Sequence, residues 1–206
     1  VTARQAAADD ERLIATIKND AILAPMLSTV TPSLHLGGLA GNFAAGVSRS
    51  VMVSGVVVDE HNHMLQWNDY GLKSYAKPLV LTAAEPDGVV VGTGVARRLK
   101  LCNTLNLSKC VQSSPVIKTS EGTSAPDDIL ALSDLEKTAA PVVDEARIEM
   151  LASTAHGAPN VASLRVVAAN NMGIKAFDDV YMGMHLAQAQ KLIYGSDTPK
   201  VTSIRI

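Results

Sequence analysis

The chain has 206 residues, which is enough for one large domain or for two small ones that share strands. Hydrophobic residues make up 47% and charged residues 18%, so a packed core is expected, and this composition argues against disorder of the whole chain. The net charge is −2, aromatic residues make up 3%, and no long basic run occurs, which argues against nucleic acid as a partner.

The apolar periodicity predicts helices and strands in mixed order, which favours an α+β fold over a doubly wound sheet. Residues 59–78 are polar and predict a short helix or loop, and Gly37, Gly38, Gly41 and Gly46 predict a loop. Residues 141–150 fit either a strand or a helix. Helices are predicted at residues 3–18, 93–100, 127–137 and 185–194, and strands at 26–36, 50–58, 79–82, 89–91, 105–107, 116–118, 161–168, 180–184 and 201–206.

No stretch of the sequence is apolar for long enough to cross a bilayer. The longest, Val51–Val58, is interrupted by Ser54 and Gly55. The first residues also lack the basic and apolar regions of a signal peptide. Both features fit a cytosolic protein, and they fit equally well a domain separated from its membrane helices.

The motif Gly92-Thr93-Gly94-Val95-Ala96-Arg97 follows a predicted strand and opens a predicted helix, as a dinucleotide-binding fingerprint does. However, Arg97 stands where the third glycine or alanine is needed, and no suitable acidic residue follows at the right distance. The motif therefore predicts a tight turn, and a soluble nucleotide-binding enzyme is the alternative.

Other polar clusters give no recognisable active centre. His61 and His63 would share a metal if they lay on one face of a strand, but a solvated loop is the better interpretation. His35 and His156 look isolated, and no Gly-x-Ser-x-Gly motif occurs. The adjacent carboxylates Asp178 and Asp179 fit a turn that caps backbone groups better than acid–base catalysis. We therefore expect no enzyme, and no catalytic, cofactor-binding or metal-binding residues.

The two cysteines, Cys102 and Cys110, lack further metal ligands at suitable spacing. Composition leaves two interpretations open, free thiols in the core or a local disulfide. The disulfide requires an oxidising compartment.

Four groups of segments carry a family resemblance through their order and spacing. They are Ser33–Asn42 with Arg49-Ser50 and the strand through Gly55 to Asp59; Gly88–Leu101; Val161–Ala169 with Asp178–Met182; and Leu186–Ile193 with Val201–Ile204. Together they resemble the extracytoplasmic domain of MacB/LolC/FtsX-like ABC-transporter permeases. One step differs, because Cys102-Asn103-Thr104 replaces the glycine-aspartate pair of the family.

The resemblance implies a two-lobed fold of the MacB-like periplasmic core type. Residues 1–100 and 160–206 would form a porter-like lobe of βαβ elements from both chain ends. Residues 101–159 would form the inserted, variable α/β lobe.

The resemblance also implies a function without bond chemistry and without cofactors. The domain would lie at the periplasmic face of the bacterial inner membrane and transmit ATP-driven motion by rigid-body shifts. Its partners would be a cytoplasmic ATPase, a second permease subunit, and a periplasmic adaptor or substrate protein. Efflux, lipoprotein release and control of a cell-wall enzyme all stay open, as does a stand-alone binding domain. An oxidising periplasm would favour a Cys102–Cys110 disulfide.

Overall fold

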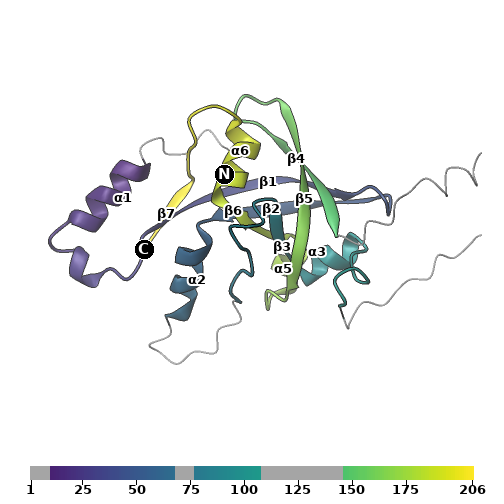
Figure 1. The fold of residues 1–206 in the computed structure, drawn as a ribbon, viewed down its shortest axis with the longest axis horizontal. Helices are drawn as coiled ribbons and strands as arrows, with labels where there is room; N and C mark the ends of the chain where they lie inside the picture. The colour runs from purple at the N-terminus through teal and green to yellow at the C-terminus, as the bar shows by residue number, and fades with distance from the viewer. Residues whose placement is uncertain (1–9, 68–76, 108–145) are drawn as a thin grey trace, which may run out of the picture.

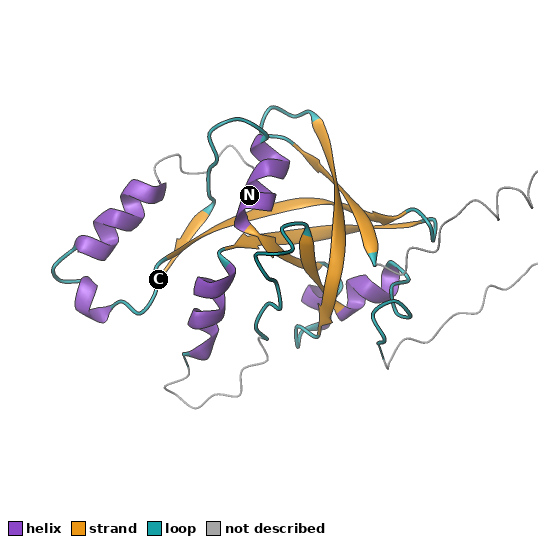
Figure 2. Ribbon diagram, in the orientation of Figure 1, coloured by secondary structure: helices purple, strands orange, loops and turns teal. Residues whose placement is uncertain are grey.

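The computed structural model describes residues 10–67, 77–107 and 146–206. These residues form a closed β-barrel with short helices around it, which confirms the predicted α+β class (Figures 1 and 2). The strands are β1 (Thr31–Asn42), β2 (Val47–Val56), β3 (Gly88–Gly92), β4 (Arg147–Ser153), β5 (Pro159–Asn170), β6 (Tyr181–His185) and β7 (Ser203–Arg205). The helices are α1 (Asp10–Asn19), the 3₁₀ turn η2 (Ala24–Met26), α2 (Val58–Gln66), α3 (Thr93–Arg98), α5 (Lys175–Asp178) and α6 (Leu186–Tyr194).

The barrel runs in the order β1-β2-β6-β3-β5-β4 and closes from β4 back to β1. The pairs β2–β6 and β3–β5 are parallel, and the other pairs are antiparallel. The short strand β7 lies outside this ring and pairs with the start of β1, with Thr31 opposite Arg205. The chain therefore enters β1 and leaves β7 side by side, at one end of the barrel.

Apolar side chains fill the interior of the barrel and pack between the barrel and the surrounding helices. The strand β3 reads Gly-Val-Val-Val-Gly and is buried on both faces, as its unbroken apolar run predicts. Val89 and Val91 belong to the main core, while Val90 faces a second cluster with Val56 and Leu79. Three strands, β2, β3 and β6, each pass almost directly into a helix.

The predicted glycine loop is wrong for three of its four residues. Gly37, Gly38 and Gly41 lie inside β1, and only Gly46, with a φ of +64°, lies in the turn before β2. A Cβ atom on Gly38 would come within 2.6 Å of the Leu151 carbonyl oxygen. Glycine there lets β1 and β4 approach closely where the barrel closes.

Two short predicted strands are also wrong. Residues 79–82 are buried at Leu79 and Leu81 but make no strand ladder. Instead, the Asn62 side chain of α2 bonds both backbone groups of Leu79, at 2.8 and 2.9 Å. Residues 105–107 form a turn whose leucines pack on the core. The predictions for residues 3–9, 116–118 and 127–137 lie outside the described residues.

The predicted two-lobed division needs correction. The strand β4 falls within the range 101–159 assigned to an inserted lobe, yet it pairs with both β1 and β5 in the barrel. Alternating burial of Ile148, Met150 and Ala152 places one face of β4 in the main core. The boundary at residue 160 is therefore too late, and the described residues form a single barrel. Residues 108–145, most of the expected insert, lie outside the described ranges.

Candidate functional site

Asp178 is a buried carboxylate that holds the N-terminus of α3. It accepts hydrogen bonds from the Thr93 backbone N–H at 2.9 Å, the Thr93 hydroxyl at 2.6 Å and the Gly94 N–H at 2.8 Å. The Met172 N–H lies at 3.3 Å and the Arg97 guanidinium at 3.7 Å. A carboxylate at this position satisfies free N–H groups and the helix dipole. The prediction that Asp178 caps backbone groups is confirmed.

The glycines of the Gly92-Thr93-Gly94 turn serve this same contact. A Cβ on Gly92 would stand 2.1 Å from the Asp178 carbonyl oxygen, and one on Gly94 would stand 2.8 Å from the Asp179 Cα. These glycines are therefore needed for close approach of the 178–179 turn. The position where a phosphate would bind is filled by the Asp178 carboxylate, which argues against nucleotide binding here.

His61 and His63 lie on α2 and not on a strand. Two positions apart on a helix correspond to a rotation of about 200°, so the two imidazoles face different surroundings. His63 Nδ1 lies 2.6 Å from the Thr29 hydroxyl, while His61 faces Arg205. The described residues contain no group of three possible metal ligands.

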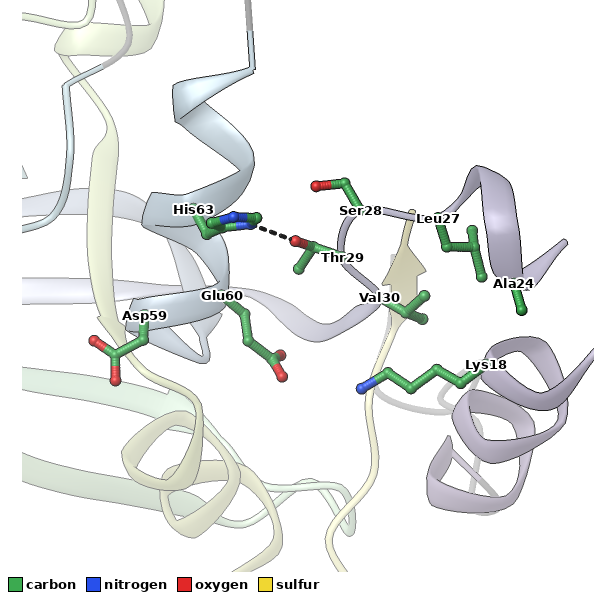
Figure 3. Close-up of a pocket in the computed structure, with 9 residues that line it drawn as sticks. All are labelled: Lys18, Ala24, Leu27, Ser28, Thr29, Val30, Asp59, Glu60 and His63. Atoms are coloured by element: carbon green, nitrogen blue, oxygen red, sulfur yellow. Dashed lines mark hydrogen bonds between the residues drawn. The ribbon is translucent and has the colours of Figure 1, made fainter.

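His63 borders a cleft of about 590 Å³ between α2 and the segment formed by α1, η2 and residues 27–30 (Figure 3). We call this segment, residues 10–30, the arm. The hydrogen bond between Thr29 and His63 ties the arm to α2. Deeper in the cleft, Lys18 and Glu60 extend toward each other from the two sides.

Lys18 and Glu60 lie on opposite sides of the cleft without forming an ion pair. Glu60 Oε2 is buried and has no hydrogen-bond partner, and no ion pair within 4.0 Å joins it to Lys18 or to any other described cation. A buried carboxylate oxygen without a partner is costly.

A second cavity, of about 460 Å³, lies on the outside of the barrel against β1, β2, β6, β7 and α2. We call it the Arg205 pocket. The Arg205 guanidinium donates to His35 Nε2 at 3.1 Å and contacts His61 Nδ1 at 3.5 Å. Since arginine only donates, these two nitrogens carry no proton. Burial, followed by the charge of Arg205, holds the pKa of both imidazoles below the ordinary 6.5.

The opposite wall of the Arg205 pocket is apolar. Met52 lies beside Tyr181 in the β2–β6 pair, and the Phe177 ring packs on Tyr181 with 5.1 Å between centroids. Burial raises the pKa of the Tyr181 phenol above 10.0. Gly37 faces the pocket, and a Cβ on it would meet no atom within 4 Å. Lys77 is the second cation at the rim.

Two further residues singled out in the sequence have partners. His156, expected to be isolated, bonds the Asp197 carboxylate at 2.8 Å, although both side chains are exposed. Cys102 is disulfide-bonded. Cys110 lies outside the described residues, so the pairing of the two cysteines stays a prediction.

Sequence patterns missed the Arg205 pocket because its members come from distant segments. His35 and Arg205 are 170 positions apart and meet only because β7 pairs with β1. Alternation along β1 would have placed His35 on the outer face, opposite Leu34. No local signal identifies Arg205 as its partner.

Comparison of the chain with protein-family models gives no match, and neither does comparison with curated proteins. Within the described ranges, no helix is both long and apolar enough to span a membrane.

Proposed function

We propose that the chain is the extracytoplasmic domain of an ABC-transporter permease of the MacB/LolC/FtsX-like type, which transmits motion and catalyses no reaction. The observation that carries the proposal is the pairing of Thr31 with Arg205. A domain between two membrane helices must send both of its connections back to the same membrane. A chain that enters and leaves its barrel side by side meets this requirement.

The arm supports a role in motion. It precedes β1 directly, and its apolar side chains Ile22 and Met26 are 75% and 69% exposed. Exposed apolar groups of this kind suit a segment near a membrane or a partner subunit. The unpaired Glu60 oxygen opposite Lys18 supports two arm positions, open as observed and closed with the ion pair formed.

In this proposal the barrel corresponds to the porter-like lobe, and residues 108–145 supply the variable insert. Movements driven by a cytoplasmic ATPase reach the barrel through the arm and β7. The barrel passes these movements on to the proteins that it contacts on the periplasmic side of the inner membrane. These proteins are the second permease subunit and an adaptor or substrate protein. No cofactor takes part.

The first test is the hydropathy of the full-length protein. We expect one apolar stretch of about 20 residues before Val1, three such stretches after Ile206, and an ATPase encoded nearby. A full-length protein that ends close to both positions would contradict the proposal and favour a stand-alone binding domain.

The second test exchanges the charges across the cleft in the full-length permease assembled with its ATPase. Lys18→Glu and Glu60→Lys should each lower coupled ATP hydrolysis, and the double variant should restore it. Lys191→Glu, on the exposed face of α6, is the matched control. Single variants that hydrolyse ATP at the normal rate would exclude the arm as the moving part.

A further inference from the structure

We propose that the Arg205 pocket binds a small amphiphile, with a carboxylate or phosphate head on Arg205 and an apolar tail along Met52, Phe177 and Tyr181. This inference rests on the pocket alone and does not depend on the proposed function. It assigns a ligand class to a cavity that the transmission of motion does not require.

The charge of the pocket selects an anion. Arg205 is half-buried, and no carboxylate of the described residues lies within 4.0 Å of it. Its two partners, His35 and His61, accept hydrogen bonds but bring no negative charge. Lys77 adds a second positive charge at the rim, and none of the described residues that line the cavity is acidic. A guanidinium with free donors matches the geometry of a carboxylate or a phosphate.

The walls of the pocket select an apolar tail. Met52 is 59% exposed and Phe177 is 41% exposed, which is unusual for large apolar side chains that border one cavity. Leu65 and Met172 extend the same surface. A volume of about 460 Å³ lies within the range of small-molecule sites, where a few polar groups orient a mostly apolar ligand.

The open space over Gly37 shows where the tail can lie. Gly37 pairs with Met52 across the β1–β2 hairpin, so the missing side chain leaves room directly beside the methionine. Any larger residue at this position would project into the cavity. Glycine here is not needed for backbone packing, in contrast to Gly38.

The experiment measures binding to the protein by calorimetry and by the shift of the melting temperature. The probes are octanoate, octyl phosphate and the neutral octyl glucoside, each below its micelle-forming concentration, together with acetate and inorganic phosphate. We expect the two charged octyl compounds to bind, octyl glucoside to bind far more weakly, and the heads without tails to give no shift. Comparison of octanoate with octyl phosphate distinguishes a carboxylate ligand from a phosphate ligand.

Three variants locate the site. Arg205→Met should weaken Kd about tenfold or more, as loss of a charge-assisted contact predicts, while Arg147→Met, at an exposed side chain of β4, should not. Met52→Glu should weaken binding by repulsion, with Met52→Gln as its neutral control. Gly37→Leu should block the cavity and leave every charge in place.

The exposed positions 37 and 52 keep the test decisive even if Arg205→Met fails to fold, because neither side chain lies in the core. Equal binding of octyl glucoside would overturn the anionic head. Unchanged binding to Met52→Glu and Gly37→Leu would overturn the location, and no binding of either charged probe would overturn the proposal.

Discussion

The hydroxyl of Thr93 donates a 2.6 Å hydrogen bond to the carboxylate of Asp178, which lies 85 residues further along the chain. This bond joins the start of α3 to the turn before β6. Since β3 and β6 are neighbours in the barrel, the contact joins the β3–α3 connection to the α5–β6 connection, in addition to the ladder between the two strands. In this motif, which resembles a nucleotide-binding turn, the Asp178 carboxylate thus occupies the position that a phosphate would take.

Asp178→Asn should destabilise the fold by about 1–3 kcal/mol, since the amide cannot accept from all the buried donors that the carboxylate serves. The measurement is urea-induced unfolding. Asp179→Asn is the matched control, because the Asp179 carboxylate forms its ion pair with the exposed Lys175, so its loss should change the free energy of unfolding little. Equal effects of the two variants would refute the role given to Asp178.

Gly94→Ala should lower the melting temperature strongly, because the new methyl group would collide with the backbone of the 178–179 turn. Gly37→Ala serves as the control, since its methyl group meets open space and alanine suits a strand better than glycine. In the same melting assay, saturating ATP or NAD should give no shift. A clear shift would revive the nucleotide-binding alternative.

The sequence predicted several strands and helices close to their observed bounds, but it predicted neither the barrel nor the second half of β1. Unbroken valines predicted β3, and the strands predicted at 161–168 and 180–184 correspond to β5 and β6. The helix predicted at 185–194, with Gly195 as its C-terminal cap, corresponds to α6. Barrel closure depends on pairs such as Leu39 with Leu151, which are more than one hundred positions apart and carry no local signal. Gly38 predicted a loop because the close approach of another strand cannot be read from its neighbours.

Folding stability should depend on His35 and His61 between neutral and mildly acidic pH. Their pKa values are lowered in the folded state, so the unfolded chain binds more protons below about pH 6.5. Stability should therefore be constant above that pH and fall as the pH drops through the lowered values. Asp20 and Asp179, whose pKa values are lowered from the ordinary 3.8, contribute to the pH dependence of stability only at more acidic pH.

The check is chemical denaturation from pH 5 to pH 8. The double variant His35→Gln and His61→Gln should flatten the curve in this window, whereas His156→Gln, at the exposed pair with Asp197, should not. A wild-type curve that rises toward acid would contradict the assignment of neutral imidazoles beside Arg205.

Cys102 and Cys110 should show no free thiol when the protein is unfolded without reductant. Two reactive thiols would contradict the predicted bridge. Because the closed loop is short, reduction should cost about 2–3 kcal/mol of stability, measured against the double variant Cys102→Ser and Cys110→Ser.

The position of β1 in the barrel has a consequence during protein synthesis. Its first partner, β2, follows at once, but β4 begins at Arg147, so a ribosome needs roughly 5–20 s to supply it. For that time the β1–β2 hairpin has open edges, the state in which strands associate with other chains. This risk is lowered in the half of the hairpin next to its turn by the glycines of β1 and by the polar residues Ser48, Arg49 and Ser50 of β2. Variants that make this half more apolar should therefore reduce yield before they change the finished barrel.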